Sequence, residues 1–108
     1  MKTLKFVHEL VDPILKGEKF ITWRLWDEKD LSEGDEIGLI DKSTGESFSK
    51  AKITKVTLKK MGGLAEEDFG GHEEFKSEEE RYKVYSRYYG RPVTPNDIVK
   101  IIKFELRA

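Results

Sequence analysis

The stretch KGEKFITWR, residues 16–24, joins a short helix to a strand and decides how the chain enters its sheet. Asp12 can cap this helix with Pro13 at its first position, and Gly17 can end it in a left-handed conformation. Lys19 then leaves a tight corner before the strand begins. The stretch therefore predicts that a lysine, a hydroxyl and a guanidinium emerge from one helix-to-strand junction.

The predicted strand has two different faces, because successive side chains of a strand point to opposite sides. One face is apolar and consists of Ile21, Trp23 and Leu25. The other face carries polar chemistry beside an aromatic ring, from Phe20, Thr22 and Arg24. Positions three apart on a regular strand face opposite ways, so Lys19 and Thr22 can meet only if Lys19 precedes the strand.

The pattern Gly17-x-Lys19-x-x-Thr22-x-Arg24 resembles the signature of the ASCH domain family, Gly-x-Lys-x-x-Glu/Thr-x-Arg. This family consists of small β-barrels related to the PUA RNA-binding fold. The similarity extends through a Ser-Glu-Glu-Glu helix start, a Tyr-Tyr-Gly sequence and a closing strand at residues 101–106. The resemblance implies an α+β fold, a PUA-like mixed β-barrel with two or three short helices around it, as a single domain over residues 1–108.

Composition limits the function classes. The 108 residues contain no cysteine and two histidines, His8 and His72, so we expect no disulfide, no metal site and no cofactor. No apolar run approaches the roughly 18 residues of a membrane span, and the N-terminus lacks the apolar segment of a signal peptide. We therefore expect a cytoplasmic protein with no membrane partner. A monomer is favoured, although the sequence leaves the oligomeric state open.

The charge of the chain also restricts how it could bind a nucleic acid. Charged residues make up 38% of the chain, Gln is absent and Asn96 is the only asparagine, a bias that resembles the surface of a thermophile protein. The formal net charge of −1 argues against a grip on long nucleic acid through phosphate neutralisation alone. Any RNA contact is expected in a local basic cleft, with the acidic segments at residues 66–68 and 78–80 turned elsewhere.

The remaining elements are mostly strands. Alternation and turn residues predict strands at residues 3–7, 36–41, 48–59 and 97–106. Ser77 and Glu80 form a capping box that starts a helix, Gly90 ends it, and its inward stripe is Tyr82, Tyr85 and Tyr89. Residues 64–69 are expected to form one helical turn.

The long strand at residues 48–59 requires an irregularity. Its inward candidates are Ala51 and Ile53, followed by Val56 and Leu58. The parity changes between Ile53 and Val56, whereas a regular strand has a period of two. The sequence therefore predicts a β-bulge between these residues.

One interpretation of the junction is a ligand cleft. A lysine suits a phosphate or a polarised carbonyl, and an arginine offers paired donors to a phosphate or a base edge. Aromatic rings on the same face could stack on a base. The predicted ligand-binding residues are Gly17, Lys19, Phe20, Thr22, Arg24 and Trp26. The structural alternative, solvated charges beside a good strand former, is disfavoured by the family resemblance.

One branch of the family, the bacterial amidohydrolases that remove acetate from N4-acetylcytidine, implies a catalytic interpretation. Carried over to this chain, the resemblance implies that Thr22 is the nucleophile and that Lys19 takes its proton. Glu73 or Glu74 would then transfer protons and interact with the exocyclic nitrogen. A lysine can act as a base only where burial or a neighbouring cation such as Arg24 depresses its pKa.

The choice between the two glutamates stays open. The segment at residues 72–77 resembles the family's Glu-Gly-Phe-x-Ser, with Glu73 in the glutamate position and Glu74 in place of the usual glycine. Counting back from Ser77 in the amidohydrolases selects Glu74 instead. Both can also be exposed acids before a helix, where negative charge is favourable.

The first functional hypothesis is therefore an RNA- or nucleotide-binding ASCH domain whose partner is RNA or a modified nucleoside. The alternative is a small amidohydrolase that deacetylates N4-acetylcytidine-like nucleosides. A third possibility is a protein-interaction adaptor with no small-ligand site.

Overall fold

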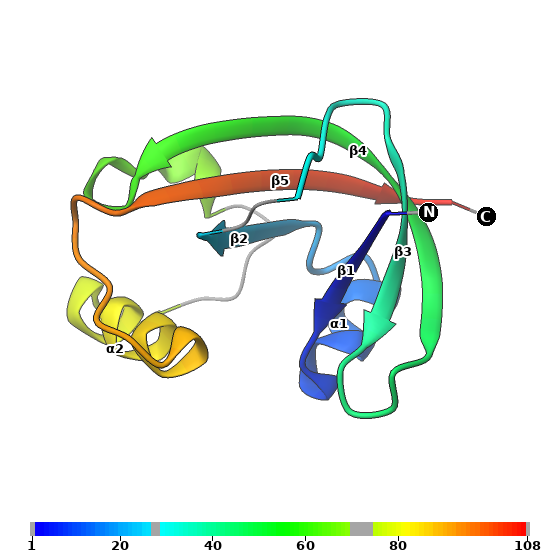
Figure 1. The fold of residues 1–108 in the computed structure, drawn as a ribbon, viewed down its shortest axis with the longest axis horizontal. Helices are drawn as coiled ribbons and strands as arrows, with labels where there is room; N and C mark the ends of the chain where they lie inside the picture. Colours follow the sequence, from blue (N-terminus) through cyan, green and yellow to red (C-terminus); the bar gives the residue numbers. More distant parts are fainter. Residues whose placement is uncertain (1, 27–28, 70–74, 108) are drawn as a thin grey trace.

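The computed structural model describes residues 2–26, 29–69 and 75–107. It contains one curled five-stranded sheet in the order β1-β3-β4-β5-β2 (Figure 1). The strands are β1 (Lys2–Phe6), β2 (Ile21–Leu25), β3 (Glu36–Asp41), β4 (Ser47–Lys60) and β5 (Ile98–Leu106). β1 and β3 are parallel, and the other neighbouring strands are antiparallel.

Two α-helices accompany the sheet, α1 (Val11–Leu15) and α2 (Glu78–Tyr89). Short 3₁₀ turns occupy His8–Leu10, Met61–Gly63 and Glu66–Asp68. In the described ranges, neither helix has the length and apolar character needed to cross a bilayer.

The helix α2 begins and ends as predicted. Its capping box forms, because the backbone N–H of Glu80 donates to the Ser77 hydroxyl at 3.1 Å. The helix stops at Gly90, whose φ of 66° lies in the left-handed region. Tyr85 is buried and Tyr82 and Tyr89 pack partly against the same core, so the predicted inward stripe is present.

The start of α1 differs from the prediction. Asp12 lies inside the helix and Leu10 occupies the N-cap without a side-chain capping bond. The cause is the preceding 3₁₀ turn, which runs directly into α1 and satisfies its first amides by backbone bonds. Gly17 has a φ of 78°, so the left-handed corner that ends this segment forms as predicted.

The predicted bulge in β4 is present. The register between β4 and β5 shifts between Ile53 and Lys55. Ala51 and Ile53 are fully buried, and Val56 packs against the same cluster. The inward prediction for Leu58 is wrong, because this residue is 64% exposed. The cause is topological: the far end of β4 runs past the region that β1 and β3 cover (Figure 1).

The sheet has a core on each side. The first core lies inside the curl, between α1 and four strands, and the second lies between the sheet and α2. Strand β5 contributes side chains to both cores. Ile102 and Phe104 belong to the first, and Val99 and Ile101 belong to the second. Trp23 is buried in the second cluster, whereas Thr22 pairs with Ile102. The two predicted faces are therefore present within β2, whereas Phe20, predicted on the Thr22 face, packs partly against the second cluster.

The barrel is open between β1 and β2, which stand at the two ends of the strand order. Side chains bridge this gap. Arg24 Nη2 donates to the carbonyl of Lys5 at 2.8 Å, and Lys29 Nζ donates to the carbonyl of Thr3 at 2.6 Å. The fold is therefore a half-barrel whose open seam brings the predicted residues of β2 beside β1.

Candidate functional site

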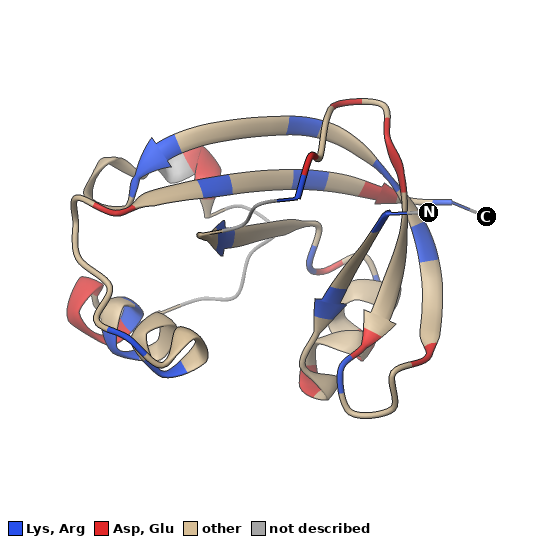
Figure 2. Cartoon of the chain, viewed as in Figure 1, with Lys and Arg blue, Asp and Glu red and all other residues tan. Residues whose placement is uncertain are grey.

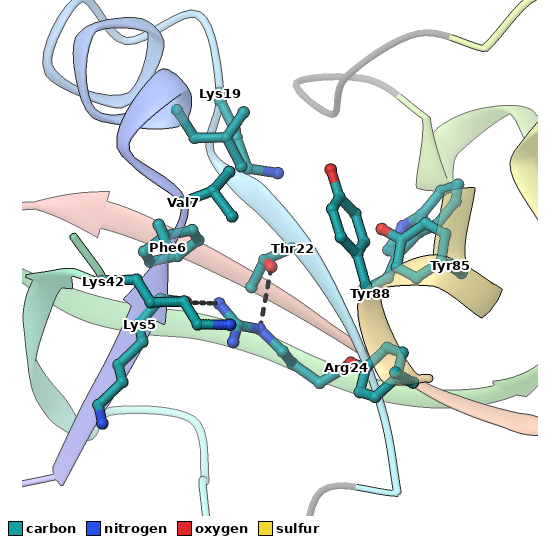
Figure 3. Close-up of a pocket in the computed structure, with 12 residues that line it drawn as sticks. Lys5, Phe6, Val7, Lys19, Thr22, Arg24, Lys42, Tyr85 and Tyr88 are labelled. Atoms are coloured by element: carbon teal, nitrogen blue, oxygen red, sulfur yellow. Dashed lines mark hydrogen bonds between the residues drawn. The ribbon is translucent and has the colours of Figure 1, made fainter. Parts of the chain in front are cut away.

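A pocket of about 170 Å³ lies at this seam, between β1, β2 and α2 (Figure 3). Four of its lining residues are cationic: Lys5, Lys19, Arg24 and Lys42. Five are aromatic: Phe6, Trp23, Tyr85, Tyr88 and Tyr89. Thr22, Val7 and Leu10 complete the wall. We call this hollow the central pocket.

Lys19 reaches the central pocket from the corner before β2. The backbone N–H groups of Glu18 and Lys19 both donate to the carbonyl of Pro13, which closes the corner. The Lys19 side chain is only 4% exposed, and its ammonium donates to the carbonyl of Ile21 at 2.8 Å. Because Lys19 precedes the strand, it lines the same pocket as Thr22, as the sequence required.

Thr22 and Arg24 are held together on one face of β2. Arg24 Nε donates to Thr22 Oγ1 at 3.2 Å. The same guanidinium lies 4.8 Å from the ring centre of Phe6, in cation–π geometry. Since the Thr22 oxygen accepts from arginine, its hydroxyl proton can point to a ligand. A positive charge next to this oxygen also favours its alkoxide form.

The wall opposite β1 is aromatic and comes from α2. Tyr85 stacks on Trp23 at a centroid distance of 5.7 Å, and Tyr88 meets Tyr85 edge-on at 5.6 Å. Tyr89 is fixed by the backbone N–H of Leu25, which donates to its hydroxyl at 2.9 Å. Tyr88 is 51% exposed, so its ring borders both the pocket and the solvent.

An ion pair positions the turn that carries Lys42. Asp41 Oδ2 lies 2.7 Å from His8 Nδ1, and Asp41 Oδ1 accepts from the backbone and the hydroxyl of Ser43. The hydrogen bond and charge of Asp41 raise the pKa of His8, and the same contact lowers the pKa of Asp41. The backbone N–H of Lys42 in turn donates to the carbonyl of Phe6. These contacts tie the turn to the end of β1.

The central pocket is electropositive although the whole chain carries a net charge of −1. No carboxylate occurs among its lining residues in the described ranges. The acidic residues Glu78–Glu80 lie at the first turn of α2, whereas Tyr88 and Tyr89 line the pocket from its last turn (Figure 2). Positive charge is therefore concentrated here, and the arrangement suits an anionic ligand with an aromatic part.

The sequence interpretation named only Lys19, Thr22 and Arg24 among the lining residues, and it missed Lys5, Lys42 and Tyr88 among others. Lys5 and Lys42 come from β1 and from the turn after β3, which no local motif connects to residues 16–24. The parallel pairing of β1 with β3 brings both to the seam. The exposed position of Tyr88 beside the inward stripe was the available signal for the aromatic wall.

The other predicted site residues lie elsewhere. Gly17 and Phe20 line a separate hollow of about 630 Å³ between α1 and β5, which Lys19 also borders. Trp26 lines a third hollow, of about 380 Å³, together with Arg24. Phe20 and Trp26 therefore do not face the central pocket. The predicted Glu73 and Glu74, with His72, fall outside the described residues.

No cluster of three potential metal-binding side chains (His, Cys, Asp or Glu) occurs in the part of the chain that the structure describes. The described lining residues of the central pocket supply ammonium, guanidinium, hydroxyl and aromatic groups.

Several solved structures share this fold. The hypothetical protein PH0355 has a TM-score of 0.73 at 26% identity, over 99% of this chain and 100% of that chain. An ASCH domain from Lactobacillus crispatus JV V101 gives 0.68 at 20% identity, over 88% of this chain and 68% of that one. A ZmASCH mutant protein from Zymomonas mobilis gives 0.65 at 16% identity, over 98% and 68% of the two chains.

No protein-family model and no curated protein matches the sequence. The structural comparison nevertheless identifies the fold. The chain has the fold of ASCH domains, and the α+β barrel expected from the family resemblance is confirmed as a curled half-barrel.

Proposed function

We propose that this chain is a binding module of the ASCH type for RNA or a free nucleotide, with one nucleotide in the central pocket. The observation that carries the proposal is the combination of four cationic and five aromatic residues around one hollow at the seam of the half-barrel. A nucleotide is the common ligand that presents an anion and a flat aromatic group together.

The two ends of a nucleotide have distinct partners in this proposal. Its phosphate pairs with ammonium groups from Lys5 and Lys42 at the exposed rim, and with Lys19 deeper inside. Its base lies against the half-exposed ring of Tyr88. The Thr22 hydroxyl and the Arg24 guanidinium provide polar contacts that fix orientation.

The size of the pocket limits the ligand. Its volume of about 170 Å³ is smaller than the roughly 300–1,000 Å³ of pockets that enclose drug-sized molecules. The pocket is therefore too small for a folded RNA element, and it holds only part of a nucleotide, with the remainder at its open rim.

The test is calorimetric titration with each of the four ribonucleoside 5′-monophosphates and the matching nucleosides at low salt. We expect saturable binding that weakens without the phosphate and weakens again in Lys42→Ala. Lys52→Ala is the matched control, an exposed lysine on β4 that lies outside the central pocket. If no mononucleotide and no short RNA binds saturably, the proposal is wrong.

A second candidate, amidohydrolysis of an N4-acetylcytidine-like nucleoside, draws support from one specific observation. The buried ammonium of Lys19 and the hydroxyl of Thr22 border the same pocket, and Arg24 Nε donates to Thr22 Oγ1. In this reaction Lys19, as the neutral amine, takes the proton of Thr22 Oγ1 while this oxygen attacks the acetyl carbonyl. The amide C–N bond then breaks, and Lys19 passes the proton to the departing nitrogen. Water then releases acetate from the acyl-threonine.

Incubation with N4-acetylcytidine separates the two candidates. Release of cytidine and acetate that is lost in Thr22→Val and kept in Thr22→Ser would establish the hydrolase. Mononucleotide binding without turnover supports the binding module. Thr22→Val is the appropriate change because it keeps the shape of the side chain and removes only the reacting oxygen.

A further inference from the structure

An apolar patch lies on the other side of Arg24 from the central pocket. It consists of Trp26, Leu58 and Ile98, which are 39%, 64% and 51% exposed, and it borders a hollow of about 380 Å³. We call these three residues the Trp26 patch. Arg24 lines both hollows, so the patch and the central pocket are neighbours.

The sheet itself creates the patch. Leu58 pairs with Lys100, and Lys60 pairs with Ile98, at the end of the β4–β5 ladder. This end extends past β1 and β3 (Figure 1), and Leu58 and Ile98 are largely exposed there. Large exposed side chains that gather in one place are typical of binding surfaces.

Trp26 is held in an unusual backbone conformation. Its φ is 52°, and it is the only non-glycine residue with positive φ among the described residues. Bulky side chains disfavour this region, and such strain is concentrated at functional sites. The Arg91 guanidinium lies 3.9 Å from the centre of the Trp26 ring, and Tyr89 meets the ring edge-on at 5.4 Å. The indole is therefore presented as a fixed platform.

Cations surround the patch. Arg24 and Lys100 line its hollow, and Arg91 stacks on the indole. Among the described residues that line the hollow, Asp97 is the one carboxylate, and it accepts hydrogen bonds from the backbone N–H and the hydroxyl of Thr94. An apolar, aromatic surface with a positive rim is complementary to a nucleobase attached to a phosphate backbone.

We propose that the Trp26 patch is a second nucleotide subsite, which binds the base adjacent to the one in the central pocket. The ligand is then a single-stranded nucleic acid of at least two nucleotides, and its backbone passes Arg24 between the two bases. This inference rests on the proposed function, because it needs the central pocket to hold the first nucleotide. It goes further by assigning a separate site and a minimum ligand length.

The test compares ligands of two lengths by calorimetry. Uridine 5′-monophosphate reports the central pocket alone, and the trinucleotides UUU and dTdTdT report both subsites as RNA and DNA. We expect both trinucleotides to bind the wild type more tightly than the monophosphate. Trp26→Gly removes the ring and suits the positive φ. It should weaken trinucleotide binding about 5- to 150-fold, the range for loss of one base stack, while monophosphate affinity changes less than about twofold.

Two further variants and one control complete the test. Trp26→Phe should restore most of the trinucleotide affinity because it restores an aromatic face. Leu58→Ser should weaken trinucleotide binding, whereas Leu15→Ser, at a leucine that is 47% exposed on α1, should not. A difference between UUU and dTdTdT measures the combined contribution of the 2′-hydroxyl and the C5-methyl group of thymine.

The outcomes distinguish the two proposals. If the monophosphate binds but trinucleotides gain nothing, or if Trp26→Gly weakens both ligands equally, the second subsite is excluded and the proposed function stands. If no nucleotide of either length binds, both proposals are wrong. If sedimentation shows a dimer that Leu58→Ser dissociates, a second copy of the chain covers the patch and the subsite is excluded.

Discussion

Arg24 Nε donates to Thr22 Oγ1 at 3.2 Å while Arg24 Nη2 donates to the Lys5 carbonyl at 2.8 Å. One guanidinium thus orients the pocket hydroxyl and joins β2 to the free edge of β1. Because lysine cannot form two such bonds in a fixed geometry, Arg24→Lys should lower the free energy of unfolding by about 1–3 kcal/mol. Nucleotide affinity should fall at least about tenfold. Urea denaturation and calorimetric titration measure the two effects.

The control is Arg87→Lys, at an exposed arginine on α2 that lies outside the central pocket. It should leave both quantities within experimental error. Wild-type stability and affinity in Arg24→Lys would mean that the guanidinium fork has no role at the seam.

Lys19 offers a test of a buried charge. Its side chain is 4% exposed and donates to the Ile21 carbonyl at 2.8 Å. Lys19→Met keeps a similar unbranched volume, so stability should change by less than about 1.5 kcal/mol. Ligand affinity, or turnover in the hydrolase interpretation, should be lost because the ammonium is gone. Thermal denaturation and titration give the two readouts.

Lys55→Met is the matched control, since Lys55 is an exposed lysine of β4 outside the central pocket. It should bind ligand as the wild type does. Normal binding and turnover in Lys19→Met would remove Lys19 from both functional proposals.

The His8–Asp41 pair predicts a pH window of stability. The pKa of His8 is raised above 6.5, chiefly by its hydrogen bond to Asp41, so this contribution is complete below pH 6.5 and is lost as the pH rises through the raised value. The pKa of Asp41 is lowered below 3.8, again chiefly by His8, so its contribution is complete above pH 3.8 and is lost in more acidic solution. The pair should stabilise the fold most between these limits.

Melting temperatures of the wild type and His8→Gln across the pH range measure this window. The difference between the two proteins should be largest near pH 5 and should shrink toward both pH 3 and pH 8. A difference that stays constant with pH would show that the contact is not an ion pair.

The local elements were predictable because their signals are short in range. The capping box at Ser77, the left-handed residues Gly17 and Gly90 and the β3 boundaries are all read from neighbouring positions. The start of α1 could not be predicted in this way, because a 3₁₀ turn without a side-chain cap takes the place of the N-cap predicted at Asp12. Backbone hydrogen bonds of a preceding turn can start a helix without requiring a characteristic residue in the sequence.

Only part of the candidate site could be predicted from the sequence. The motif places Lys19, Thr22 and Arg24, because one corner and one strand fix their relative positions. Lys5 and Lys42 depend on which strands form the sheet edges, and this is a property of the whole topology. Trp26 left the predicted face because its positive φ turns the chain at the end of β2. Local alternation cannot foresee such a turn.

The bulge in β4 leads to a prediction about two deletions. The β4–β5 pairing runs from Ile53 opposite Phe104 to Lys55 opposite Lys103, so Thr54 is the extra residue of the bulge. Removing Thr54 leaves Ile53 and Val56 two positions apart, and a regular strand then points both inward. The deletion loses only the Thr54 bond to the Lys103 carbonyl and some local twist. It should fold with a loss below about 2 kcal/mol.

Deleting Lys52 on the same strand should have the opposite result. Ala51 and Ile53 would become adjacent, so one of these two fully buried residues would face solvent. Exposing a buried isoleucine costs about 2–5 kcal/mol, a large part of the stability of a domain of this size. Circular dichroism and urea denaturation of the two deletion variants provide the comparison. If the Thr54 deletion unfolds the chain as the Lys52 deletion does, the bulge is needed to bend β4 and not only to correct its parity.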